Sequence, residues 1–144
     1  DFGRVFIDQF ENVVSMMFGA GSQKCVTSRI CGKALAIEHN GDLYSCDHFV
    51  YPEYRLGNIT ATHEGDLAFS DAQKRFAFAK SDTLPKYCQS CPYLALCWGN
   101  CPKDRFIRAP DGEAGLHYLC SGLKAFYRKA TSARRELARR LGRA

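Results

Sequence analysis

The chain is 144 residues long, 46% of them hydrophobic and 24% charged, with a formal net charge of +5. This length and composition predict one globular domain with its own hydrophobic core. No apolar run is long enough to cross a bilayer and no secretory leader opens the chain, so we expect a cytoplasmic protein and exclude the membrane-spanning and secreted classes.

Residues 6–18 predict an amphipathic helix, because their apolar side chains recur at helical spacing and Gly19 and Gly21 follow. The chain opens Asp-Phe-Gly without an initiator Met, and together with this immediate helix that suggests a fragment of a longer protein. We expect apolar side chains from the first 37 residues to supply the core, namely Phe6, Ile7, Phe10, Val13, Val14, Leu35 and Ile37.

A β-hairpin is predicted over residues 35–46. Residues 35–39 alternate as a strand, Asn40-Gly41 is a strong two-residue turn signal, and residues 43–46 supply the returning strand. Residues 51–58, which follow, are rich in turn formers and predict a loop.

Two further helices are predicted downstream. Ser70 and Gln73 have the spacing of a capping box, which begins a short helix that runs to about Lys80. Residues 109–112 predict a turn, and a long helix begins near His117. The last residues predict a solvated basic helix rather than a nucleic-acid-binding surface. Its basic side chains are Arg128, Lys129, Arg134, Arg135, Arg139, Arg140 and Arg143.

Cysteine is the most informative residue type in the sequence. Its eight thiols predict metal ligands in a reducing compartment, because a chain of this size without a secretion signal does not need four disulfides. Four of them form the run C-x2-C-x5-C-x3-C-P over residues 88–102, which matches the bacterial ferredoxin run except for a longer middle gap. Within it, Tyr93, Leu94 and Trp98 are expected to shield a cluster from water.

The ferredoxin precedent predicts how the eight thiols divide, because the last cysteine of that run binds the other cluster. Cys101 would then join the three upstream cysteines. The two predicted four-thiolate sets are Cys25, Cys31, Cys46 and Cys101 for the first cluster and Cys88, Cys91, Cys97 and Cys120 for the second. No cysteine is left over, and folding is expected to depend on metal loading.

Three other uses of the thiols remain open. Two structural zinc sites would use the same cysteines, although zinc ribbons usually present two C-x2-C knuckles and this chain has one. A disulfide framework would need an oxidising compartment. A thioredoxin-like redox role for Cys88 and Cys91 lacks the surrounding βαβ pattern.

The cysteine spacing resembles that of the SPASM domain of radical S-adenosylmethionine enzymes, and within that group the anaerobic sulfatase-maturating enzymes. The shared pattern is Cys31-x9-Gly41-x4-Cys46, then the run over residues 88–101, then Cys120 after 18 residues. Residues 38–53 and 56–58 look like that family's hairpin and following loop, and Leu84-Pro85 and residues 117–120 also look like it. The resemblance covers about residues 6–128.

The resemblance implies an α+β fold, a small SPASM-like domain with a β-hairpin, cysteine-rich loops and flanking helices. It implies two 4Fe-4S clusters, with ligand sets that agree with the division above. The full enzyme is implied to oxidise a Cys or Ser of an unfolded sulfatase to formylglycine, using a radical made from S-adenosylmethionine. A reductant such as ferredoxin or flavodoxin is the implied electron source, with no nucleic acid and no membrane as partner.

Asp47 follows the third cysteine directly, at the position that the family is proposed to use as a catalytic base. A carboxylate there can accept the thiol or hydroxyl proton of the substrate as the carbon is oxidised. The alternative is a loop aspartate that caps backbone amides beside a cluster.

The radical-generating C-x3-C-x2-C motif of the family is missing, because Asp104 stands where the third cysteine would follow Cys97 and Cys101. The S-adenosylmethionine site and a third 4Fe-4S cluster are therefore expected on a partial TIM barrel N-terminal of residue 1, and this chain alone is predicted to be inactive. The expected organisation is a barrel remnant with an exposed face at residues 1–22, a double-cluster domain at 23–128 and the basic helix at 129–144.

Three other functions compete with sulfatase maturation. The domain could belong to another radical enzyme that modifies peptides, act alone as a ferredoxin-like electron carrier, or be a zinc-stabilised interaction module. Metal and sulfide analysis of anaerobically purified protein separates the iron–sulfur functions from the zinc module. Metal analysis of aerobically purified protein could give a misleading result, since zinc can replace clusters that are lost in air.

Overall fold

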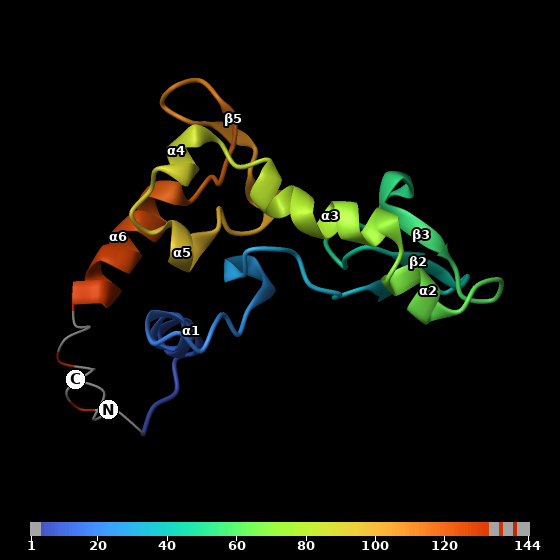
Figure 1. The fold of residues 1–144 in the computed structure, drawn as a ribbon, viewed down its shortest axis with the longest axis horizontal. Helices are drawn as coiled ribbons and strands as arrows, with labels where there is room; N and C mark the ends of the chain where they lie inside the picture. The colour runs from blue at the N-terminus through green and yellow to red at the C-terminus, as the bar shows by residue number, and fades with distance from the viewer. Residues whose placement is uncertain (1–3, 133–135, 137–139, 141–144) are drawn as a thin grey trace. The chain divides into compact units, whose positions relative to one another are not determined.

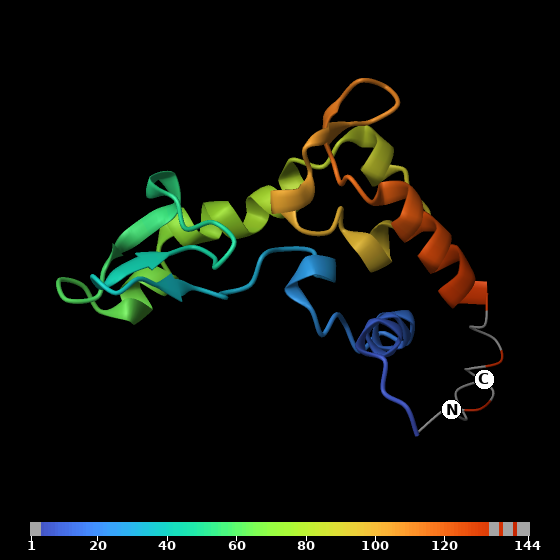
Figure 2. The same ribbon diagram turned by 180° about the vertical axis from the view of Figure 1, so that it is seen from behind.

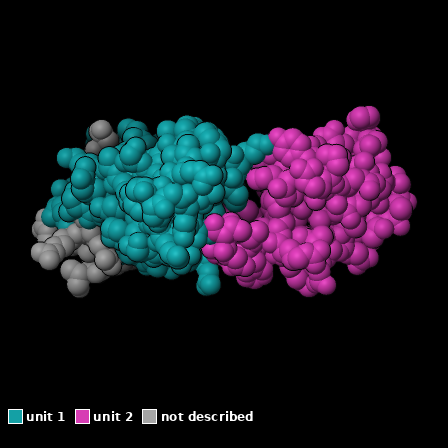
Figure 3. Space-filling model, turned by 90° about the horizontal axis from the view of Figure 1, so that it is seen from above, with its two compact units in different colours: residues 1–29, 84–144 teal, residues 30–83 magenta. Residues whose placement is uncertain are grey.

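The computed structural model describes residues 4–132, 136 and 140 as helices joined to small antiparallel sheets (Figure 1). The chain divides into two compact units, coloured separately in Figure 3. Unit 1 is built from residues 1–29 and 84–144, and unit 2 from residues 30–83. None of the helices in the described part combines the length and the apolar character that crossing a lipid bilayer requires.

Unit 2 contains a three-stranded antiparallel sheet of β1 (Ala36–Ile37), β2 (Asp42–Tyr44) and β3 (Arg55–Asn58), in that order. The predicted hairpin is confirmed, with Ile37 opposite Leu43. Its turn needs a glycine, because Gly41 has a φ of 85° while its N–H donates to the Glu38 carbonyl at 2.9 Å. Leu43, on the central strand, is 1% exposed and anchors this sheet.

The prediction of a loop over residues 51–58 is wrong for its second half, which is β3. Side chains from across the sheet hold this strand in place. Arg55 contacts Asp42 with 2.5 Å between Nη2 and Oδ1, and Asn58 Nδ2 donates to the same oxygen at 3.0 Å. These tertiary contacts impose an extended backbone on a segment, Arg-Leu-Gly-Asn, that has little strand preference of its own.

Two helices, α2 (Glu64–Ala68) and α3 (Asp71–Asp82), complete unit 2. The predicted capping box is confirmed, since the Ser70 hydroxyl accepts the Gln73 N–H at 3.2 Å, and α3 runs two residues past Lys80. The short helix α2 was not predicted. It lies close against β3, because a Cβ placed on Gly57 would come within 2.7 Å of Leu67.

Unit 1 packs short elements of the cysteine-rich segment against two longer helices, α1 (Asp8–Met17) and α6 (Cys120–Ser132). The short elements are η1 (Cys25–Thr27), α4 (Lys86–Gln89), α5 (Leu94–Cys97), η3 (Pro102–Asp104), β4 (Ile107–Arg108) and β5 (Ala114–Leu116). Figure 2 shows the β4–β5 hairpin leading into α6. The turn predicted at residues 109–112 joins these two strands, and the Gly112 N–H donates to the Ala109 carbonyl at 2.9 Å.

The core of unit 1 differs from the predicted one. Its buried members are Leu84, Cys88, Ala109 and Leu116. Of the residues predicted to form a core, Val13 is 1% exposed, but Phe6, Ile7, Phe10 and Ile37 are 75%, 50%, 47% and 58% exposed. The expectation of a core position is wrong for these four side chains, but the exposure of Phe6, Ile7 and Phe10 agrees with the exposed face that was also expected at residues 1–22.

The helix predicted near His117 begins at Cys120 and is described to Ser132. Most of the basic helix predicted for residues 129–144 lies outside the described residues, including Arg134, Arg135, Arg139 and Arg143. Arg140 is described, and its Nε lies 2.7 Å from Glu136 Oε1.

Candidate metal centre

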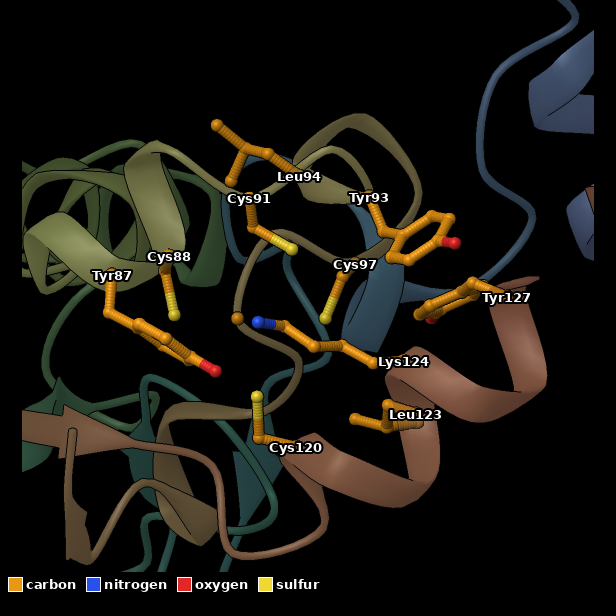
Figure 4. A pocket seen from close by; sticks show the side chains of 11 residues that line it. Tyr87, Cys88, Cys91, Tyr93, Leu94, Cys97, Cys120, Leu123, Lys124 and Tyr127 are labelled. Carbon is orange, nitrogen blue, oxygen red and sulfur yellow. The ribbon is translucent and has the colours of Figure 1, made fainter. Parts of the chain in front are cut away.

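Four thiols of unit 1 line one pocket, and they belong to the second predicted set. Cys88 comes from α4, Cys91 follows that helix, Cys97 ends α5 and Cys120 begins α6. Figure 4 shows their four sulfur atoms directed into the same space. The pocket encloses about 330 Å³ between atoms, part of it open to solvent. The structure therefore brings this set together, while metal binding by it stays a prediction.

The backbone between Pro85 and Cys91 explains how the first two thiols reach the pocket. Pro85 precedes α4 in an extended conformation, and its carbonyl accepts the Cys88 N–H at 2.8 Å. The Cys91 N–H then donates to the Cys88 carbonyl at 3.1 Å, which closes a turn around the C-x2-C pair. This tight turn lets two cysteines three residues apart present their sulfurs to one pocket.

A left-handed turn separates Cys97 from Cys101, the last thiol of the run. Trp98, Gly99 and Asn100 have φ values of 48°, 66° and 55°. The Arg105 guanidinium stabilises this turn by donating to all three carbonyls, at 2.6 Å to Trp98, 2.9 Å to Gly99 and 3.0 Å to Asn100. Cys97 lines the pocket and Cys101 does not, so the turn lies between thiols of the two predicted sets.

Replacing Gly99 by Ala is expected to lower the free energy of unfolding by about 2–5 kcal/mol, combining left-handed strain with overpacking. The new Cβ would lie 2.4 Å from Leu84 Cδ2 and 2.8 Å from Arg105 Nη2. Gly112 is the matched control, since its φ is 87° but no atom lies within 4 Å of the place that a Cβ would take there. Gly112→Ala should lower the free energy of unfolding by only about 1–2 kcal/mol. Urea denaturation of anaerobic protein measures both, and equal losses would contradict the role assigned to close packing at Gly99.

The four pocket thiols influence one another electrostatically. Burial, followed by the charges of Cys120 and Cys97, raises the pKa of Cys88 to about 11. Burial is also the main cause that raises the pKa of Cys97 and of Cys120. Because the thiolate form is the metal ligand, cationic metal must displace these protons, and its charge then relieves the repulsion between thiolates.

The pocket thiols surround a space and do not converge on a point. Across residues 4–132, 136 and 140, no three His, Cys, Asp or Glu side chains meet closely enough to hold a single metal ion. A four-cysteine zinc site needs sulfur atoms only about 3.8 Å apart, because its tetrahedral Zn–S bonds are about 2.3 Å long. Four cysteine thiols are the ligand set of a four-iron cluster and of a structural zinc site alike, so the group that binds here stays a prediction.

Sequence reasoning predicted part of the pocket lining. Tyr93 and Leu94 line it as expected, whereas Trp98 packs against the core of unit 1 and lies under Arg29, 5.5 Å from Cζ to the ring centroid. The lining residues not anticipated are Tyr87, Gly99, Leu123, Lys124 and Tyr127. Leu123, Lys124 and Tyr127 could have been found from the sequence, because they follow Cys120 by three, four and seven positions and so share its helix face.

Lys124 places a positive charge in the pocket. Its Nζ lies 3.9 Å from the centroid of the Tyr87 ring, and Figure 4 shows the ammonium among the cysteine sulfurs. A cation beside four thiolates favours their ionised form. Lys124 accordingly lowers the pKa of Cys120, against the larger effect of burial.

The first predicted set is divided between the units. Cys25 and Cys101 belong to unit 1, and Cys31 and Cys46 belong to unit 2. Burial raises the pKa of Cys46 to about 11, and the charges of Asp47 and Cys31 contribute. That Cys25 and Cys101 join this pair stays a prediction.

Helix α3 ties together the two loops that carry Cys31 and Cys46. The Cys31 N–H donates to the Ala77 carbonyl at 3.1 Å. The Gln73 side-chain amide, 2% exposed, donates to the Gly32 carbonyl at 3.3 Å and to the Ser45 carbonyl at 3.2 Å. These contacts fix the backbone directly beside both thiols, which is what a rigid pair of ligands requires.

Asp47 is exposed and sits directly beside the Cys46 thiol. Its Oδ1 accepts from Cys46 Sγ at 3.2 Å and from the His48 N–H at 3.1 Å. The hydrogen bond from Cys46 is the main cause that lowers the pKa of Asp47, so the carboxylate is ionised at neutral pH. The contact with the His48 N–H is that of a capping aspartate, while the exposed carboxylate could also act as a base. Catalysis by Asp47 stays a prediction.

Comparison with known proteins identifies the class of domain. Residues 25–92 match the SPASM family model, which describes an iron–sulfur cluster-binding domain. This segment is similar to a SPASM domain, and the resemblance predicted from the cysteine spacing is confirmed. Cys97, Cys101 and Cys120 lie beyond the matched segment.

The relatives are anaerobic sulfatase-maturating enzymes. The chain is 42% identical over 127 residues to the serine-type enzyme of Bacteroides thetaiotaomicron, covering 88% of this chain and 31% of the relative. It is 29% identical over 128 residues to the cysteine-type enzyme of Clostridium perfringens, covering 88% and 34%. The chain thus spans about a third of the length of the relatives that it matches.

A solved structure shares the fold. Native anSMEcpe with bound AdoMet and the Cp18Cys peptide superposes with a TM-score of 0.80 at 26% identity, covering 97% of this chain and 38% of that one. The mixed arrangement of helices and small sheets is thus that of a sulfatase-maturating enzyme over nearly the whole chain.

Proposed function

We propose that this chain is the auxiliary-cluster part of a radical S-adenosylmethionine enzyme that oxidises a Cys or Ser of a sulfatase to formylglycine. The SPASM match and the serine-type and cysteine-type relatives support this activity. The AdoMet and the peptides bound by the solved neighbours support an S-adenosylmethionine site and a peptide substrate for the longer protein. The radical-generating motif is not part of this sequence, so the chain alone is inactive.

The proposal includes two 4Fe-4S clusters, held by the two predicted cysteine sets. The observation that carries it is the pocket of unit 1, where thiols from separate segments of the chain point into one space. Four cysteines are the usual ligand set of such a cluster. When bound, each cluster supplies an acceptor and donor of single electrons.

Asp47 is the residue that we assign to proton transfer. Its carboxylate is exposed and adjacent to a predicted ligand of the first cluster, so a substrate thiol or hydroxyl can pass its proton to Oδ1 or Oδ2 as the carbon is oxidised. A reductant of the ferredoxin or flavodoxin type and a reducing, cytoplasmic compartment complete the proposal. We further propose that residues 1–22 are a barrel remnant, residues 23–128 the double-cluster domain and residues 129–144 a basic helix.

Metal analysis tests the cluster assignment. Protein purified without oxygen is expected to contain about eight iron and eight sulfide per chain, as two four-iron clusters require. Elemental analysis and sulfide determination measure both, and an aerobic preparation of the same protein is the control for loss and replacement by zinc. Zinc without sulfide in the anaerobic protein would contradict the proposal and favour the interaction module.

A further inference from the structure

Tyr127 is a fully buried tyrosine beside the thiol pocket. It lies on the face of α6 that carries Cys120, and its side chain is 0% exposed. Its hydroxyl makes no hydrogen bond of regular geometry with the described residues, and the side chain with which it interacts is that of Cys97. Burying a hydroxyl without a regular hydrogen bond is unfavourable, so this position points to an acceptor that completes the site.

The surroundings of Tyr127 indicate where that acceptor lies. Its ring lines the thiol pocket together with Cys97. Figure 4 shows the Tyr127 hydroxyl on the pocket side, whereas the Tyr93 hydroxyl is turned away from the sulfurs. A phenol hydroxyl beside a thiolate acts as the donor, because a thiolate has no proton to give.

Packing alone does not explain a tyrosine at this position. The Tyr127 ring contacts Tyr93 and Phe126, with centroid distances of 6.1 Å and 5.4 Å. A phenylalanine would make the same ring contacts without a buried hydroxyl. The ring contacts therefore do not account for the hydroxyl oxygen.

We infer that the Tyr127 hydroxyl donates a hydrogen bond to the Cys97 sulfur when that sulfur is a cluster ligand, and that Tyr127 thereby raises the reduction potential of the second cluster. The inference rests on the proposed function, which supplies the cluster. A neutral thiol is a weak acceptor, but a thiolate bound to iron is negatively charged and accepts strongly. The donated bond stabilises the more negative reduced state, and hydrogen bonds to the sulfurs are one determinant of cluster potentials.

Replacing Tyr127 by Phe tests the inference in anaerobic, cluster-loaded protein. Redox titration followed by electron paramagnetic resonance should show one of the two cluster potentials shifted to a more negative value and the other unchanged. Tyr93→Phe is the matched control, because it removes a hydroxyl from the same pocket that does not face the sulfurs. Two unchanged potentials in Tyr127→Phe, or an equal shift in Tyr93→Phe, would overturn the inference.

A second variant tests the inference even if Tyr127→Phe does not bind clusters. Placing 3-fluorotyrosine at position 127 keeps the hydroxyl and makes it a stronger donor, so the same potential should move in the positive direction. No shift, or a shift in the negative direction, would overturn the inference. Wild-type iron and sulfide content, measured first, reports separately on the proposed function: a protein without clusters contradicts that function before any tyrosine is changed.

Discussion

Asp47→Asn, in the longer protein that we propose, is expected to lower turnover by a factor on the order of 10²–10⁴, the range typical of losing a general base. The amide keeps the size of the side chain and can still accept from the His48 N–H, but it cannot take a proton from the substrate. Mass spectrometry of a sulfatase-derived peptide measures formylglycine, and iron content should remain that of the wild type.

The control for Asp47 is another exposed aspartate of unit 2. Asp71 also has a lowered pKa, caused mainly by its hydrogen bond from Lys74, and it begins α3 instead of following a cysteine. Asp71→Asn should leave turnover unchanged. If Asp47→Asn also retains wild-type turnover, Asp47 is a loop-capping residue and not the catalytic base.

Cys101→Ala is expected to remove the first cluster and spare the second, so that iron and sulfide fall by about half. The reason is the predicted assignment of Cys101 to the upstream cysteines, across the turn that separates it from Cys97. Spectroscopic signals of the remaining cluster, recorded anaerobically, should match one of the two wild-type components.

Cys97→Ala is the matched variant, since it lies four residues away at the other end of the same turn. It should remove the other wild-type component and spare the one lost in Cys101→Ala. Loss of the same component in both variants, or equal loss of both components in each, would show that the proposed division of the thiols is wrong.

The elements predicted correctly from sequence are those determined by local signals. Asn40-Gly41 sets the β1–β2 hairpin, and Ser70 with Gln73 sets the start of α3, because each acts through hydrogen bonds within a few residues. β3 depends on side chains from the neighbouring strand. β4 and β5 have only two and three residues, which is too short to show an alternation of apolar and polar side chains. Burial was also mispredicted for Phe6 and Phe10, since periodicity does not identify what covers a helix face.

For the candidate site, the cysteines of the pocket could be predicted from the sequence, but several of the residues around them were missed. The spacing of the run over residues 88–101 indicated which thiols gather, because three cysteines so close in sequence can wrap around one body. Lys124 and Tyr127 were missed because no motif includes them. Only their placement on the helix face of Cys120 brings them to the pocket.

Two of the pocket cysteines are also packing residues. Cys88 is a buried member of the small core of unit 1, and Cys120 packs against it. Oxidation of such a thiol by air, past the reversible sulfenic stage, creates a sulfinate or sulfonate group that is polar and charged. A charged oxyacid is incompatible with a position between Leu84 and Leu116. Oxygen damage at these positions would therefore disrupt the architecture of unit 1 permanently, in addition to destroying its inorganic centre.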